Sequence, residues 1–264
     1  QGLAKSAEVA GQLGIKGSQN ILKFSETIEK LKLTSDIVGD DSVRQFAKFI
    51  EVSNDSVENA DRLGSVITEL GNNFATSERQ ILKNATEIQK GIAIYDVSAQ
   101  STLALGAATS ALDAMQIHML TALGSEAEQS RSAMQKGFKA LNDAAVSGKN
   151  LDRILQLTGL SLEEFTTKWS NSSQDVFKDF INGLNLASES GEDLSSILGE
   201  LGLDAIRTEV VLGILSKNID VVNEAFSRAS TEVENNKALT KEYDAATQSL
   251  AVAIDDVKDA FDQL

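Results

Sequence analysis

The sequence predicts an all-α fold, and three observations support this class. The chain has 264 residues, no proline and 18 glycines, so glycine is the main residue available to interrupt a helix. Aromatic residues make up only 5%, and the alternating pattern typical of strands is scarce. Apolar residues recur instead at spacings of three and four. We expect a compact multi-helix body of short, glycine-punctuated helices with a longer C-terminal helix.

The first third of the chain predicts three helices before a hairpin. Residues 3–14 form a short helix that the glycines of AGQLGIKG end. Ser18 caps the second helix, and residues 40–53 form the third. Asp55 and Glu58 have the spacing of a capping box ahead of the hairpin. The apolar faces are Ile21, Phe24, Ile28 and Leu31 on the second helix, and Val43, Phe46, Ala47 and Ile50 on the third.

Residues 59–90 predict a tight helical hairpin around which the chain is organised. Gly71 can end its first helix in the left-handed conformation, with Asn72 and Asn73 capping the loop. Thr76 or Ser77 can cap the second helix, with Gln80 placed to close a capping box, and Phe74 lies at the corner. The two apolar faces are Val57, Ala60, Leu63, Ile67 and Leu70, and then Ile81, Ala85 and Ile88.

The middle of the chain continues as helices separated by glycine. Residues 91–97 are expected to be a loop, Ser98 to cap a helix rich in small residues, and residues 125–146 to form a long polar helix. The small residues Ala104, Gly106, Ala107, Ala108 and Ser110 would let another helix approach closely.

The sequence of the remaining body predicts further helices. Ser161 with Glu164, and Ser172 with Asp175, have the spacing of helix starts. Residues 192–216 read as two short helices joined at Gly202, and another helix follows through residues 219–233. Among the core candidates, Leu70, Phe74, Ile81, Phe177, Phe180 and Ile206 are expected to be largely buried.

The last helix carries a heptad pattern. Leu239, Ala246, Ala253 and Ala260 repeat every seven residues, and Tyr243, Leu250, Val257 and Leu264 do the same four positions later. Such a seam starts a coiled coil or packs a long helix on its own domain. We expect a helical domain over residues 1–235 and an exit helix over residues 236–264 that begins a coiled coil.

Composition restricts the function classes. The formal net charge of −15 disfavours nucleic-acid binding through a basic patch. There is no cysteine for a disulfide or thiolate site and no apolar run of membrane-spanning length, and we expect no signal peptide because the sequence does not open on a basic and then hydrophobic segment. The first residue is not methionine and the chain starts as if within a helix, which favours a piece of a longer polypeptide.

Catalytic, cofactor and metal sites have little support in the sequence. His118 is the only histidine, and without a motif around it a packing role is favoured over a ligand or a catalytic base. The carboxylate pairs Asp40/Asp41, Glu163/Glu164, Glu192/Asp193 and Asp255/Asp256 lie mostly at helix starts, and Trp169 reads as a core anchor. We expect no enzyme, no cofactor and no metal.

Several segments, taken in order, resemble one known family. The run DRLGSVITELGNNFATSE at residues 61–78, which includes Leu70 to Phe74, is similar to the core region of phage tail tape measure proteins. AGQLGI, LALGAATSAL, GLSLEEF with FINGLN, ELGLDAIR around Gly202 and Ile206, and NEAFSRASTEVENNKALTKEYDAA resemble the same family.

The resemblance implies a structural role rather than chemistry. Proteins of that family are long, mostly helical molecules of the virion tail, made in the host bacterial cytoplasm, that set tail length during assembly and leave ahead of the DNA at infection. Implied partners are the tail tube, tail tip and assembly chaperones, with self-association through the C-terminal helix. The alternatives are a helical peptidoglycan-cleaving domain of a tail protein, and a helical interaction module of a bacterial signalling protein.

Overall fold

The computed structural model describes residues 2–12, 14–115 and 126–262, with side chains between residues 3 and 254. These residues form fourteen α-helices and two short 3-10 helices, and no strand, so the predicted all-α class is confirmed. In order they are α1 (Gly2–Gln12), α2 (Ser18–Thr34), α3 (Gly39–Val52), η1 (Val57–Asn59), α4 (Ala60–Asn73), α5 (Glu78–Ile92), η2 (Ala93–Tyr95), α6 (Ala99–Met115), α7 (Glu126–Ser147), α8 (Leu151–Thr158), α9 (Leu162–Asn171), α10 (Ser173–Glu189), α11 (Leu194–Glu200), α12 (Ile206–Lys217), α13 (Ile219–Asn235) and α14 (Ala238–Asp262).

Helix α6 lies at the centre of the body, and other helices cover it on all sides. Every residue from Ser101 to Asp113 is buried, which is the pattern of a helix with no solvent face. Helices α5 and α13 pack on it, and α5 also runs along α7. Its small residues permit this crowding: a β-carbon at Gly106 would lie 2.8 Å from the carbonyl oxygen of Ile81. The predicted close approach of another helix is confirmed.

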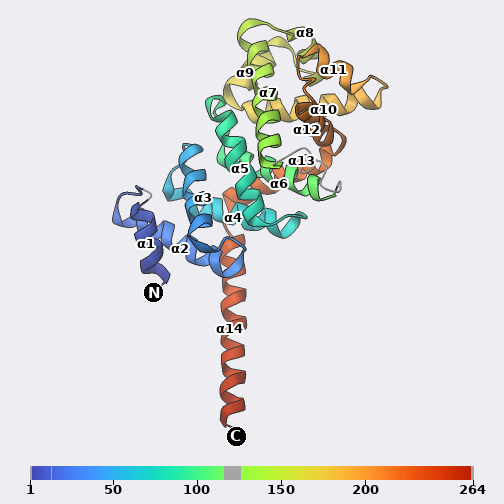
Figure 1. Ribbon diagram of the computed structural model, residues 1–264. Helices are drawn as coiled ribbons and strands as arrows, with labels where there is room; N and C mark the ends of the chain where they lie inside the picture. Colours follow the sequence, from blue (N-terminus) through green and yellow to red (C-terminus); the bar gives the residue numbers. More distant parts are fainter. Residues whose placement is uncertain (1, 13, 116–125, 263–264) are drawn as a thin grey trace.

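The rest of the body is arranged around this centre (Figure 1). Helices α1 to α4 form one end, and α8 to α12 form the other end together with the far part of α7. Buried apolar side chains from Val9 to Leu239 form one continuous core. At the far end Phe177 stacks on Phe138, with ring centroids 4.7 Å apart, and Trp169 is half-buried against the same cluster. Helix α14 then leaves the body and projects away from it.

Some predicted helix starts form as expected and others do not. Ser161 and Glu164 make a full capping box, with Glu164 N donating to Ser161 Oγ at 3.3 Å and Ser161 N donating to the Glu164 carboxylate at 2.9 Å. Ser77 accepts from Gln80 N, but the Gln80 side chain turns to Asn84 and Glu126 instead of closing a box.

The capping predictions at Ser18 and Asp55 were wrong, while Ser172 precedes the helix that it was predicted to open but makes no capping hydrogen bond to the backbone. Gly17 stands at the N-cap of α2 with φ 89°, so Ser18 is already helical and does not cap. Ser56, not Asp55, receives the Glu58 N–H ahead of η1. Ser172 stands at the N-cap of α10, but its hydroxyl binds the Asp175 carboxylate and accepts no backbone N–H. Residue type alone does not decide among neighbouring polar side chains that can all reach a helix start.

Two glycines expected to end helices lie inside them instead. Helix α4 continues through Gly71 to Asn73, whose side-chain amide donates to the Glu69 carbonyl oxygen at 2.7 Å. Gly91 is within α5, and a β-carbon there would lie 3.3 Å from the Arg131 carbonyl oxygen. Both glycines serve close packing, not a left-handed turn. The residues with left-handed φ at the turns are Gly14, Gly17, Gly39, Gly148, Gly159, Gly191 and Gly202, together with Asn54, Asp96, Asn150 and Asn236.

None of the helices in the described ranges is both long and apolar enough to cross a membrane.

Candidate functional site

The exit of α14 from the body is held by a turn at Asn236. This residue adopts the left-handed conformation, with φ 50°, directly after α13. Its side chain accepts from Ser65 Oγ at 2.9 Å and donates to Asp61 Oδ2 at 2.7 Å, and both partners lie on α4. Asparagine tolerates this conformation better than most residues, and the two hydrogen bonds fix its side chain. The direction in which α14 leaves is therefore set by α4.

The start of α14 is capped by a residue of the preceding helix. Glu232, on α13, is buried, and its Oε1 accepts the backbone N–H of Lys237 at 2.6 Å and of Ala238 at 2.7 Å. The first N–H groups of a helix have no partner within it and carry partial positive charge. The Glu232 carboxylate satisfies them and joins the two helices across the turn.

The first turns of α14 pack on the body. Leu239 is 1% exposed and lies on α4 at Gly64, where a β-carbon would come within 2.9 Å of Leu239 Cδ2. Tyr243 lies under Lys30 of α2, with Nζ 5.9 Å from the ring centroid. Glu242 accepts from Asn72 Nδ2 at 3.1 Å, which connects the central helical hairpin to the exit helix. Residues 170 positions apart thus meet at one junction.

Beyond this junction the helix loses its cover. Of the seam residues, Leu239 is buried, Tyr243 and Ala246 are half-buried, and Leu250 and Ala253 are exposed. Val257 and Leu264 lie outside the described side chains. The heptad seam was predicted to start a coiled coil or to pack on its own domain. Its first residues pack on the body, and its remaining described residues face solvent.

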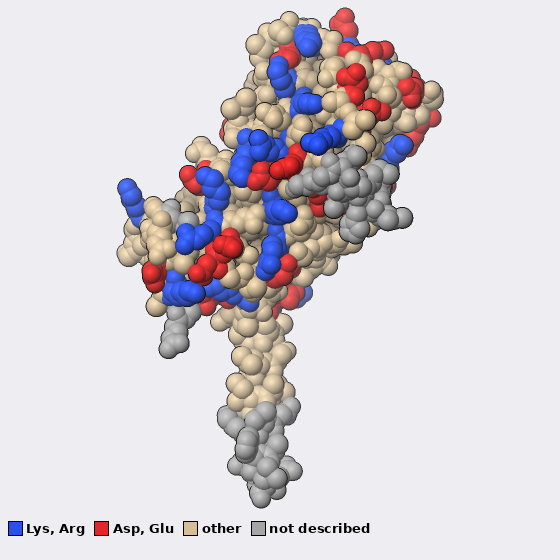
Figure 2. Space-filling view, viewed as in Figure 1, with Lys and Arg blue, Asp and Glu red and all other residues tan. Residues whose placement is uncertain are grey.

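The projecting part of α14 carries a run of five consecutive exposed apolar residues, 250–254, which Figure 2 shows as an uncharged stretch. Leu250 is 54% exposed, Val252 61% and Ile254 47%. Exposed apolar runs of this length are unfavourable in water unless another surface covers them. We call residues 250–254 the apolar run of α14. It can bind other helices through apolar burial, and it carries no group for acid–base or nucleophilic chemistry.

The predicted family-motif residues are not brought together in one place. Leu70 is buried in α4, Asn72 and Asn73 are exposed, and Phe74 caps α4 half-buried at the corner of the hairpin. Phe74 was predicted to be largely buried, and it is partly buried and packs against the core. Phe177 and Phe180 are fully buried as predicted, but at the other end of the body.

One predicted core residue, Ile206, lies at the surface instead. It was predicted to be buried, and it is 69% exposed at the first residue of α12. Gly202, with φ 72°, turns the chain between α11 and α12, so that Leu201 and Leu203 enter the core in its place. Ile206 is the first residue of α12, so no preceding helical turn places its side chain on the core. The spacing of apolar residues alone did not show that the helix begins at this residue.

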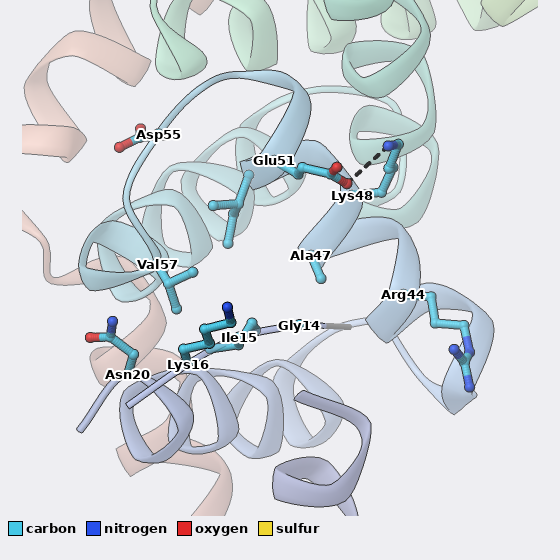
Figure 3. Close-up of a pocket in the computed structure, with 11 residues that line it drawn as sticks. Gly14, Ile15, Lys16, Asn20, Arg44, Ala47, Lys48, Glu51, Asp55 and Val57 are labelled. Atoms are coloured by element: carbon cyan, nitrogen blue, oxygen red, sulfur yellow. Dashed lines mark hydrogen bonds and ion pairs between the residues drawn. The ribbon is translucent and has the colours of Figure 1, made fainter. Parts of the chain in front are cut away.

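A groove on α3 is a second candidate site (Figure 3). It has a volume of about 400 Å³ and lies between α3 and the turn that follows α1. We call it the α3 groove. Its lining residues are Gly14, Ile15, Lys16, Asn20, Arg44, Ala47, Lys48, Ile50, Glu51, Asp55 and Val57. Arg44, Ala47, Lys48 and Glu51 follow one face of α3 at spacings of three and four, so the small Ala47 leaves a hollow between longer side chains.

Two helix endings of the same kind build the walls of the α3 groove. After α1, the N–H groups of Gly14 and Ile15 donate to the carbonyl oxygens of Gly11 and Ala10, both at 3.1 Å. After α3, the N–H groups of Asn54 and Asp55 donate to Glu51 and Ile50 at 3.1 and 3.2 Å. This pair of bonds is the Schellman ending of a helix. Sequence reasoning read these residues only as helix ends, and their meeting in space carries no local signal.

The titratable groups form no recognisable catalytic arrangement. Asp40 and Asp41, and Glu163 and Glu164, lie in first turns of helices, as expected. The side chains of Asp255 and Asp256, and all of His118, lie outside the described residues. Within the described part of the chain, no cluster of three or more histidine, aspartate or glutamate side chains could hold a metal ion.

Glu126 is a partly buried carboxylate whose pKa is shifted. Burial raises its pKa, while hydrogen bonds from the amides of Asn84 and Gln80 favour the ionised form. The group therefore belongs to a polar contact between α5 and α7, and sequence reasoning did not find it.

Two surfaces of the described chain are thus candidates for binding another molecule: the apolar run of α14 and the α3 groove. A scan against protein-family models, a search of curated proteins and a search of solved structures each found no match to this chain.

Proposed function

We propose that this chain is a structural segment of a bacteriophage tail tape measure protein, acting in tail assembly and tail-length determination. The observation that carries the proposal is the apolar run of α14, which continues a heptad pattern away from a folded body and has no cover of its own. The ordered motifs that resemble the family add support. In this role the chain belongs to the virion tail and is made in the host bacterial cytoplasm.

The body would be a folded node and not part of the measuring rod. A single helix of this length would reach roughly 400 Å at 1.5 Å for each residue, whereas α1 to α13 fold back on one core. Helix α14 would begin the rod. Its partners would be further helices that cover residues 250–254, including other copies of the chain, together with the tail tube, the tail tip and assembly chaperones.

The test lengthens α14 in the phage that encodes this chain. Ten extra heptads inserted after Ala253 should lengthen the tail by about 105 Å, since each residue of a helix adds about 1.5 Å. Tail length is measured by electron microscopy of purified virions, and mass spectrometry confirms that the chain is present in tails. The matched control inserts the same number of glycine and serine residues after Gly148, in the exposed turn between α7 and α8, and should leave the length unchanged.

An unchanged tail after the heptad insertion, or tails that lack the chain, would contradict the proposal. A cell-wall digestion assay with the purified chain separates it from the peptidoglycan-cleaving alternative. We expect no release of soluble peptidoglycan fragments. Release that is lost on a single Glu→Gln change would favour the enzyme.

A further inference from the structure

We propose that the α3 groove is a docking site for an acidic peptide segment of a partner protein, with a large apolar side chain between its carboxylates. The proposal concerns a surface between α3 and the turn after α1, and it does not depend on the function proposed for α14. It rests on three features of the groove: its floor, its unpaired cations and its rigid walls.

The floor of the groove is apolar and deep enough for a side chain. Ile15, Ala47 and Val57 are half-buried in its lining, together with Ile50 at 2% exposure. The volume of about 400 Å³ lies within the roughly 300–1,000 Å³ typical of ligand pockets. A leucine or phenylalanine side chain that enters here loses its contact with water and covers Ile15 and Val57.

The charges of the lining without an ion-pair partner favour an anionic occupant over a cationic one. Glu51 neutralises Lys48, at 2.9 Å, whereas Asp55 accepts only from the neutral groups Ser56 N and Asn59 Nδ2, at 2.7 and 2.8 Å, and keeps its negative charge. Among the described residues, no carboxylate lies within ion-pair distance of Lys16 or Arg44, and Arg44 donates only to Gln12, at 3.2 Å. Lys16 and Arg44 thus outnumber Asp55 among the charges of the lining that have no ion-pair partner. In Figure 3, Lys16 lies beside Ile15, and Arg44 lies at one end of the groove with its side chain directed outward.

This arrangement selects the chemistry of the occupant. A basic segment would meet Lys16 and Arg44 with like charge, and a purely acidic one would leave the floor uncovered. An acidic segment with a central apolar side chain satisfies both. The walls need no rearrangement, because the Schellman endings at Gly14 and Asn54 hold Ile15 and Asp55 in place.

The experiment measures the fluorescence anisotropy of three labelled peptides with the full chain. EELFEE should bind at least about tenfold more tightly than EEGSEE, which lacks the apolar centre, and than KKLFKK, which reverses the charges. The double variant Lys16→Glu with Arg44→Glu should lose at least roughly tenfold in affinity for EELFEE, and Ala47→Trp, which fills the hollow, should do the same. Circular dichroism establishes that each variant is folded.

The matched control is Lys83→Glu with Lys217→Glu, which makes the same charge change at two exposed sites outside the groove. Its affinity for EELFEE should stay within about twofold of that of the wild-type chain. The proposal is overturned if this control loses as much affinity as the groove variant, if EEGSEE binds as tightly as EELFEE, or if none of the three peptides binds. Tighter binding of TQSLAVAIDDVKDAFD, residues 247–262 of this chain, would also overturn it, because the occupant would then be a second copy.

Discussion

Leu239 lies directly on Gly64, and this contact joins the exit helix to the body. The space above residue 64 is filled by the Leu239 side chain together with Thr27 and Leu31 of α2. Only a residue without a β-carbon leaves room for this packing, since a methyl group there would approach Leu239 Cδ2 to 2.9 Å. The position of the last helix therefore depends on a glycine far away in the sequence.

Leu239→Ala should destabilise the chain by about 2–5 kcal/mol, because it leaves a cavity against Gly64 and Leu31. Chemical denaturation measures the free energy of unfolding. In this variant, amide hydrogen exchange should accelerate more in the first turns of α14 than in α6, relative to the wild-type chain. Leu250→Ala is the matched control: its side chain is 54% exposed, and the change should stay within about 0.5 kcal/mol. Equal costs for the two variants would contradict the anchoring role of Leu239.

Gly183→Ala should prevent α10 from packing on α8. A β-carbon at Gly183 would lie 1.8 Å from the carbonyl oxygen of Leu157, and neither backbone can give way without moving its helix. We expect a loss of at least about 3 kcal/mol, the upper end of typical overpacking costs. At Gly199, in α11, a β-carbon meets nothing within 4 Å, so Gly199→Ala should stabilise the chain by up to about 1 kcal/mol. Thermal unfolding of both variants gives the comparison.

Phe177→Ala should cost about 3–5 kcal/mol, because its buried ring stacks on Phe138 and fills the far end of the core. Phe74→Ala should cost clearly less, since Phe74 is only half-buried at the corner of the hairpin. Urea denaturation of the two variants tests this order. A cost at Phe74 equal to that at Phe177 would show that the corner is as tightly packed as the core.

Glu78→Gln should stabilise the chain at neutral pH, and the gain should shrink toward about pH 4. Burial, with the nearby Asp36 carboxylate, raises the pKa of Glu78 above its value in the unfolded chain. The folded chain therefore binds the Glu78 proton more tightly than the unfolded chain does. The stability that protonated Glu78 contributes is fully present below the pKa of Glu78 in the unfolded chain and is lost as the pH rises through its pKa in the folded chain. The expected gain near neutral pH is below about 1 kcal/mol, since the side chain is partly exposed.

Glu87 provides a control of opposite sign. Against the cost of its burial, the ion pairs with Lys90 and Arg131 lower the pKa of Glu87. The stability that ionised Glu87 contributes is present above the pKa of Glu87 in the unfolded chain and is lost as the pH falls through its pKa in the folded chain. Glu87→Gln should therefore destabilise the chain more near neutral pH than near pH 4. Urea denaturation at both pH values should give opposite trends for the two variants, and parallel trends would contradict the assignment.

The sequence by itself determined the helical class and most helix boundaries. The absence of proline and the spacings of three and four are local properties, and so is the Ser161 and Glu164 box, whose two bonds form within four residues. The turn between α13 and α14 at Asn236 falls where the sequence predicts the exit helix to begin. The heptad on α14 was likewise visible as a pattern.

Only the tertiary structure decided which side of each pattern is covered. A spacing of three and four marks an apolar face but does not say what lies against it, so Leu239 and Leu250 look alike in sequence although one is buried and the other is exposed. Gly71 and Gly91 resemble helix ends, but close neighbours at Glu78 and Arg131 explain them. The α3 groove exists because two separate helix endings meet beside Ala47. These outcomes depend on contacts between segments far apart in the chain, and local sequence carries no record of such contacts.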